Sequence, residues 1–181
     1  MTGPEPSLPD KVLAIDAALN GIPHAFGGAL ALGYYAEPRS TVDVDLNVFV
    51  APDESQVVLD RLESIGVEVA GADPGVASDG QVRVWWGRTP LDLFFSYDRF
   101  HDAAAVAVVD QPFAGGTVPV LAVEHLVVCK VVFDRPKDWV DLDAIIERGT
   151  AIDAAEVLRW VGRFLGDDDP RYERVARVLS A

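Results

Sequence analysis

Residues 41–50 constrain the fold of this chain most, because apolar and polar side chains alternate strictly along them. The apolar positions are Val42, Val44, Leu46, Val48 and Val50, and the intervening ones are Asp43, Asp45, Asn47 and Phe49. Successive side chains of a β-strand point to opposite faces of the sheet. The segment therefore predicts a strand with one buried face and one face that carries two carboxylates.

Periodicity predicts the other elements. Helices are expected at residues 9–20, from the Gly27-Gly28 pair to about residue 35, and at 54–65, 123–133, 138–147, 152–165 and 170–179. Strands are expected at residues 22–26, 82–86, 91–95 and 118–121, with a loop at 71–80 and a short helix followed by a strand within 97–109. This order predicts an α+β fold, in which a mixed central sheet with helices on one side is followed by a helical part. We expect a core of residues 1–121 and a helical part, residues 122–181, packed on the same domain.

Asp43 and Asp45 share one strand face, and their side chains are rooted roughly 6.5–7 Å apart. Two carboxylates at that spacing repel each other unless a positive charge lies between them, and a divalent cation is bound by oxygen ligands. Asp92 is the third candidate ligand, because it lies alone within the apolar run 91–95, where an unpaired aspartate is costly. The pattern allows two interpretations, a metal site or the solvated face of an edge strand.

The pair Gly27-Gly28 lies between a predicted strand and a predicted helix, shortly before Asp43. Glycines at such a turn let the backbone approach a phosphate, and the helix N-terminus supplies N–H donors. An ordinary tight turn is the alternative for the glycines alone. Together with the two carboxylates, they indicate a phosphate site.

Charge and composition exclude several classes of function. The formal net charge is -14, from 29 acidic and 15 basic residues, so a broad basic surface for nucleic acid is not expected. A local basic patch remains open, because Lys130, Arg135 and Lys137 lie close together in the sequence. The single cysteine excludes a disulfide framework. With no signal-peptide pattern and no apolar stretch of roughly 18 residues, we expect a cytoplasmic protein that does not enter a membrane.

Residues 27–48, GGALALGYYAEPRSTVDVDLNV, closely resemble the signature of the nucleotidyltransferase-fold superfamily related to DNA polymerase beta. The likeness is greatest to the AbiEii-type branch, which includes toxins of abortive-infection and toxin–antitoxin systems. The matching positions are Gly27, Gly28, Arg39, Thr41, Asp43 and Asp45. A second patch, residues 124–142, is similar to the late helical motif of the family and contains Lys130, Asp138 and Asp141. Gly28 stands where many superfamily members have serine.

The resemblance implies transfer of a nucleotidyl group from a nucleoside triphosphate to a hydroxyl, with release of pyrophosphate. It implies Mg²⁺ or Mn²⁺ as cofactor, bound by Asp43, Asp45 and Asp92. These three and Lys130 are the expected catalytic residues. The expected nucleotide-binding residues are Gly27, Gly28, Arg39, Thr41, Lys130 and Asp138. Lys130 would neutralise the triphosphate, whereas Arg39 would either reach phosphate or make a structural bond to the strand edge.

The acceptor is the least constrained part of the prediction. The family implies tRNA or a protein as acceptor, and a cognate antitoxin as partner. Two alternatives stay open: a degenerate nucleotide-binding regulatory module, and a small-molecule, antibiotic-type transferase, which suits the acidic composition better. If RNA is the acceptor, a local patch must bind it, and the candidates include Arg171, Arg174 and Arg177 on the last predicted helix.

Overall fold

A mixed β-sheet forms the centre of the computed structural model, which describes residues 5–72 and 80–180. Six strands lie in the order β3-β4-β2-β1-β6-β5. Their bounds are β1 His24–Phe26, β2 Val44–Val48, β3 Gln81–Trp86, β4 Thr89–Phe95, β5 Val109–Phe113 and β6 Gly116–Val120. β2 pairs parallel with β4 and β1 parallel with β6, whereas β1–β2, β3–β4 and β5–β6 are antiparallel. The predicted hairpin of β3 and β4 is therefore confirmed.

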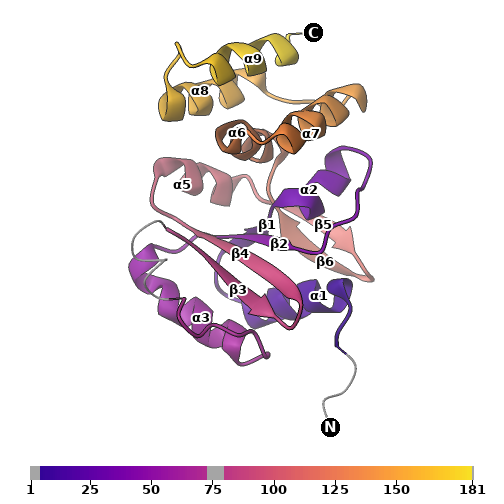
Figure 1. Cartoon of the computed structure of the whole chain (residues 1–181), viewed down its shortest axis with the longest axis vertical. Helices are drawn as coiled ribbons and strands as arrows, with labels where there is room; N and C mark the ends of the chain where they lie inside the picture. Colours follow the sequence, from indigo (N-terminus) through magenta and orange to yellow (C-terminus); the bar gives the residue numbers. More distant parts are fainter. Residues whose placement is uncertain (1–4, 73–79, 181) are drawn as a thin grey trace.

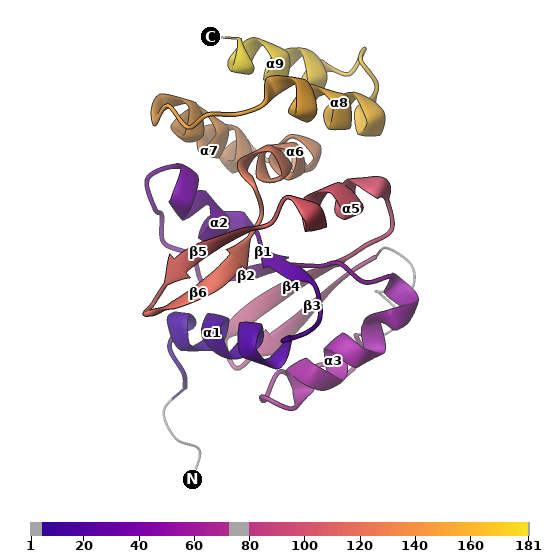
Figure 2. The same ribbon diagram turned by 180° about the vertical axis from the view of Figure 1, so that it is seen from behind.

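Helices cover both faces of this sheet. Their bounds are α1 Leu8–Ala18, α2 Gly28–Tyr35, the 3₁₀ turn η1 Pro52–Glu54, α3 Ser55–Glu63, α5 Arg99–Val106, α6 Val123–Phe133, α7 Pro136–Glu147, α8 Ala154–Leu165 and α9 Pro170–Leu179. In Figure 1, α1 and α3 lie below the sheet, α2 and α5 lie above it, and α6 to α9 form the uppermost part. The view from behind shows the same layers (Figure 2). The α+β prediction is confirmed.

The expectation of helices on one side alone was wrong. Both faces of β2 are enclosed: Leu46 is fully buried, and its neighbour Asn47, on the opposite face, is only 7% exposed. A strand with two buried faces needs a layer of helices on each side. The apolar face packs in the main core, and the other face lies under α2 and the last four helices (Figure 1).

β2 is shorter than predicted, because pairing with β4 begins at Val44. Val42 was expected on the buried face, but it lies in the turn before the strand and is 74% exposed. The same turn holds Asp43, whose carboxylate accepts a hydrogen bond from the hydroxyl of Thr41. Asp43 is therefore positioned by a local turn rather than by the sheet.

The sequence of the last third fixes helix starts clearly. Asp153 and Asp169 cap α8 and α9 by accepting hydrogen bonds from backbone N–H groups of the first turn, as aspartate does at N-caps. α6 and α9 have the bounds that the periodicity predicts. Among the described helices, none is both long and apolar enough to cross a membrane. Residues 73–79 of the predicted loop lie outside the described part of the chain.

Candidate active site

Two carboxylates, Asp45 and Asp92, lie on one face of the sheet where β2 pairs with β4, and Asp43 lies just before β2. The parallel register places Asp45 directly opposite Asp92. Asp43 precedes Asp45 by two residues and is near enough for its charge to raise the pKa of the Asp45 carboxyl. Neighbouring strands are about 4.8 Å apart, so the structure brings the three predicted ligands into one region.

Asp45 is the most perturbed of these acids. Burial raises the pKa of its carboxyl to about 6, and the negative charges of Asp43 and Asp92 act in the same direction. The nearby cations Arg135 and Lys130 oppose the rise without cancelling it. A half-buried carboxylate with two like charges beside it is stabilised by a cation that binds there.

Asp43 and Asp92 each have a partner. Burial alone would raise the pKa of Asp43, but hydrogen bonds from Thr41 and from its own backbone N–H, with the charges of Lys137 and Arg39, bring that pKa below its ordinary value. Asp92 forms a two-pronged ion pair with Arg83, with both nitrogen–oxygen distances 2.7 Å. Within residues 5–72 and 80–180, no three acidic, histidine or cysteine side chains are gathered closely enough to hold a metal ion. A cation bound by all three acids therefore requires Asp92 to exchange Arg83 for the ion.

The Gly27-Gly28 turn lies directly against Asp45. The N–H of Gly27 donates to the carbonyl of Asp45 over 2.9 Å, so this N–H is not available to a phosphate. Gly28 has a φ of +50°, and a Cβ there would lie 1.7 Å from a carboxylate oxygen of Asp45. Gly28 also begins α2, whose first N–H groups have no partner within the helix.

Lys130 belongs to an ion-pair network that joins α6 and α7 to the segment between α2 and β2. Its ammonium lies 2.6 Å from Asp141 and 3.8 Å from Asp138, and its side chain is only 5% exposed. Arg39 bonds the same Asp141 through two nitrogens, at 3.1 and 3.2 Å. Arg39 was expected to reach either phosphate or the strand edge, but it bonds to α7 instead.

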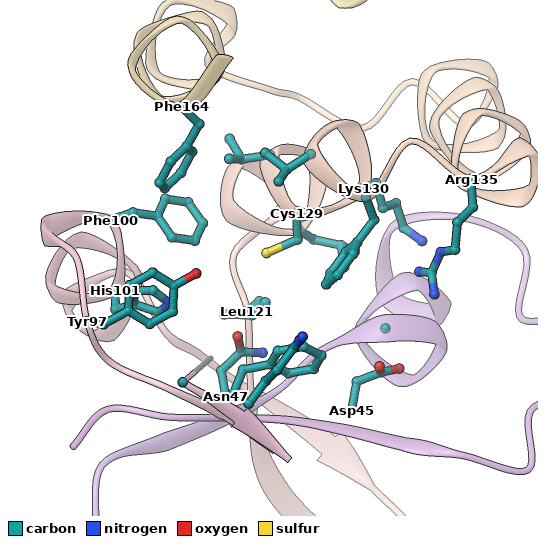
Figure 3. A pocket seen from close by; sticks show the side chains of 18 residues that line it. Asp45, Asn47, Tyr97, Phe100, His101, Leu121, Cys129, Lys130, Arg135 and Phe164 are labelled. Carbon is teal, nitrogen blue, oxygen red and sulfur yellow. The ribbon is translucent and has the colours of Figure 1, made fainter. Parts of the chain in front are cut away.

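Arg135 is the more accessible cation of this side. Asp138 is 1% exposed and accepts hydrogen bonds from the guanidinium and the backbone N–H of Arg135. Because Asp138 is enclosed in this way, it orients Arg135 and does not itself reach the cavity. The Arg135 side chain is 49% exposed and points across the cavity toward Asp45 (Figure 3).

A cavity of about 290 Å³ lies between the sheet and the C-terminal helices. One end carries Gly28, Asp45, Lys130 and Arg135. The other end is lined by the rings of Tyr97, Phe100, His101 and Phe164, and the rings of Phe94 and Phe133 lie between the two ends. Figure 3 shows the charged side chains at one end and the labelled rings of α5 and α8 at the other.

Several residues in or near the cavity were not predicted from the sequence as site residues. Asn47 alternates with Asp45 on the same strand face, so its position was readable from the pattern. Arg83 faces Asp92 across the hairpin register, which the sequence predicts only once the two strands are aligned. Tyr97 and Phe164 come from distant segments and carry no local signal.

The arginines of α9, the candidate RNA-binding patch, partly contact other residues of the protein. Arg171 pairs with Asp169 at 2.8 Å and donates to the carbonyl of Val132. The Arg174 guanidinium lies 3.8 Å from the ring centre of Trp139. Arg177 is exposed. α9 therefore packs onto the helical part and does not present three free cations on one face.

Comparisons with known proteins agree with this geometry. The family model described as "Nucleotidyl transferase AbiEii toxin, Type IV TA system" matches residues 13–178. A comparison with curated proteins gave no match.

Solved structures with the same fold include the antibiotic-resistance factor ANT(2'')-Ia, at 16% identity and a TM-score of 0.55, over 95% of this chain and 90% of that one. An antigenic nucleotidyltransferase-like protein from Paracoccidioides brasiliensis matches at 18% identity and a TM-score of 0.51, over 93% of this chain and 90% of that one. JHP933 from Helicobacter pylori matches at 16% identity and a TM-score of 0.50, over 94% and 86%. At these identities the structures support the fold, and the family model supports the membership. The chain belongs to the AbiEii family of nucleotidyl transferase toxins.

Proposed function

We propose that this protein transfers a nucleotidyl group from a nucleoside triphosphate to a hydroxyl acceptor in a metal-dependent reaction and releases pyrophosphate. The observation that carries the proposal is the position of Asp45. Its carboxylate lies beside the N-terminus of α2 and opposite Asp92, and its pKa is raised to about 6. A carboxylate destabilised in this way beside an anion-binding helix end suits a site that binds a metal ion with a phosphate.

The residues fit Mg²⁺ or Mn²⁺ by their chemistry, because Asp43, Asp45 and Asp92 supply hard oxygen ligands on one face. A divalent ion in such a site polarises the phosphoryl oxygens and lowers the pKa of the attacking hydroxyl. Asp92 would act as a ligand only after it releases Arg83, whose side chain is 54% exposed. The freed guanidinium would then be available to a phosphate.

The phosphate end of the site is supplied by α2 and Arg135. The free N–H groups at the start of α2 and the positive end of its dipole favour an anion. Arg135 presents a guanidinium fork that binds phosphate in two-pronged fashion. Lys130 would contribute positive charge near the phosphate without bonding to it, since Asp141 already bonds its ammonium. Thr41 contributes by holding Asp43.

For the acceptor we propose a hydroxyl of tRNA or of a protein, as the family suggests, with a cognate antitoxin as partner. One observation favours a small-molecule acceptor: a similar fold was solved in complex with adenylyl-2''-tobramycin, at 15% identity and a TM-score of 0.54, over 95% of this chain and 97% of that one. A degenerate module that binds nucleotide without turnover is the remaining alternative. The retained carboxylates favour an active enzyme.

The test is a labelling assay with each of the four α-labelled nucleoside triphosphates and Mg²⁺ or Mn²⁺. Separate reactions contain total RNA, a protein extract or a panel of aminoglycosides, and Asp45→Asn is the negative control. Transfer of label to one class of acceptor, lost in the variant, supports the proposal and names the acceptor. Nucleotide binding without transfer to any class would leave the degenerate module as the function.

A further inference from the structure

The cavity has one charged end and one uncharged end. A ligand that fills it should therefore have one charged part and one uncharged part. Asp45, Lys130 and Arg135 face one end. Of the described residues that line the cavity, Asp45 alone carries a carboxylate. The other end is uncharged, because burial lowers the pKa of His101 and keeps its ring neutral near pH 7. A polycation or a second phosphate is therefore poorly matched to that end.

The uncharged end is built from aromatic rings that pack on one another. Ring centres lie 4.7 Å apart for Tyr97 and His101, and 5.4 Å apart for Phe100 and Phe164. Between the two ends, Phe94 and Phe133 form an edge-on pair at 5.8 Å. Although Tyr97 is 67% exposed and Phe164 is 36% exposed, both rings line the cavity. Flat, partly exposed rings of this kind are platforms for a flat ligand group.

Asn47 lies between the two ends and has hydrogen-bonding capacity that the protein does not use. It is 7% exposed, and its amide points into the cavity (Figure 3). None of the described residues makes a hydrogen bond to this amide. A Cβ on Gly27 would lie 2.9 Å from Asn47 Nδ2, which places the amide beside the turn that begins α2. A nearly buried amide without a partner is costly, and a ligand with a matching donor and acceptor would remove that cost.

We propose that the aromatic end of the cavity binds the nucleobase of the nucleoside triphosphate, and that Asn47 is the residue that recognises the edge of that base. The inference rests on the proposed function, which places the phosphates at Gly28 and Arg135. A purine or pyrimidine offers a flat face for the rings and adjacent donors and acceptors for one amide. Asn47 thus determines which nucleotide is preferred, whereas the rings stabilise every base.

The test compares binding of the four nucleoside triphosphates as non-hydrolysable α,β-methylene analogues, with inorganic tripolyphosphate as the ligand that has no base. Titrations are carried out with Mn²⁺ on the full chain. Asn47→Leu keeps a similar volume but removes both hydrogen-bonding groups. Asn20→Leu is the matched control, because Asn20 is the other asparagine of the sequence and is exposed. A thermal melt monitored by circular dichroism checks that each variant is folded.

We expect Asn47→Leu to weaken the preferred analogue roughly tenfold, to the level of the other three, because a lost hydrogen bond of about 1.4 kcal/mol corresponds to that factor. Tripolyphosphate affinity should stay unchanged, and Asn20→Leu should match the wild type. A second variant, Phe164→Leu, changes a residue of α8 and should weaken all four analogues by a similar factor while leaving tripolyphosphate unchanged.

Two results would overturn the inference alone. If Asn47→Leu weakens tripolyphosphate as much as the analogues, Asn47 supports the glycine turn and does not contact the base. If analogues bind normally to both Asn47→Leu and Phe164→Leu, the base lies elsewhere. Failure of the wild type to bind any analogue or tripolyphosphate is a different result, which overturns the proposed function as well.

Discussion

The sheet side and the helix side of the cavity carry opposite charges, and the two sides differ in whether those charges are paired within the protein. On the sheet side, Asp45 is half-buried beside two other acids, and its pKa rises to about 6. On the helix side, Lys130 is more deeply buried but has Asp141 at 2.6 Å and Asp138 at 3.8 Å. Buried charges normally carry partners of this kind. One side is therefore internally neutralised and the other is left with excess negative charge.

This difference separates residues that stabilise the fold from residues whose charge is compensated only when a ligand binds. The helix-side network stabilises the native state, because its charges are paired within the protein. The ionised Asp45 on the sheet side costs stability until a cation binds. Mutations on the two sides should therefore have opposite effects on the free energy of unfolding, although sequence reasoning assigned both sides to the active site.

The largest expected effect is on catalysis. Asp45→Asn should reduce nucleotidyl transfer by about a thousandfold, since a catalytic metal supplies several kcal/mol of transition-state stabilisation and each 1.36 kcal/mol is a factor of ten. The measurement is the rate of label transfer under saturating nucleotide. Retention of more than a tenth of the rate would mean that the sheet-side acids are not the catalytic centre.

Next in size is the loss of stability on the helix side. Lys130→Met should lower the free energy of unfolding by about 3–5 kcal/mol, because it leaves Asp141 and Asp138 without their buried partner. Lys137→Met, on the exposed start of α7, is the control and should change stability by less than about 0.5 kcal/mol. The double variant Lys130→Met/Asp141→Leu should recover most of the loss. Urea denaturation measures the stability of all three variants. Equal stability of Lys130→Met and wild type would show that the helix-side ion pairs do not stabilise the fold.

The sheet side should show the opposite sign, with a defined pH dependence. The folded-state pKa of Asp45, about 6, lies above its reference value of 3.8. A raised pKa gives stability that is present below the unfolded pKa and is lost as the pH rises through 6. In EDTA, Asp45→Asn should therefore be more stable than wild type by about 2 kcal/mol at pH 7.5, and the difference should vanish near pH 4. Denaturation at the two pH values tests this; a destabilised variant at pH 7.5 would contradict the assignment.

A smaller effect is expected from the Arg83–Asp92 pair. Arg83→Gln should raise Mn²⁺ affinity roughly tenfold, because the metal then no longer competes with the Arg83 guanidinium for Asp92. A charged hydrogen bond of this kind contributes about 1.5 kcal/mol. Arg88→Gln is the control, since Arg88 lies on the same hairpin and pairs with Glu5 instead. Calorimetric titration gives both affinities. An unchanged value for Arg83→Gln would show that Asp92 is not a ligand.

The smallest effect concerns the acceptor. Arg174→Glu together with Arg177→Glu should reduce labelling of RNA about threefold without changing nucleotide binding, and added salt should act in the same direction. Stability should fall by no more than about 1 kcal/mol, the cost of the exposed cation–π contact of Arg174 with Trp139. RNA labelling that changes neither with the double substitution nor with added salt would point to a protein or small-molecule acceptor.

The sequence predicted the fold class and most elements, because alternation and helical periodicity are local properties. It predicted a common strand face for Asp43 and Asp45, but β2 begins only at Val44, and the parallel register of β2 and β4 brings Asp92 opposite Asp45. It could not predict that Asp141 pairs with both Lys130 and Arg39, since these residues meet only when α6, α7 and the segment after α2 pack together. The rings at the far end of the cavity were missed for the same reason.

The contact between Gly28 and Asp45 restricts how this lineage of sequences can change. A side chain at position 28 would overlap the Asp45 carboxylate, with 1.7 Å between Cβ and Oδ2, and would adopt a φ of +50°. Serine, common at this position in the superfamily, is therefore not interchangeable with Gly28 while Asp45 keeps its present rotamer. The two positions are epistatic: a change to serine becomes neutral only in a background where Asp45 has already moved. Swapping the glycine turn between family members should then fail unless the strand β2 is exchanged with it.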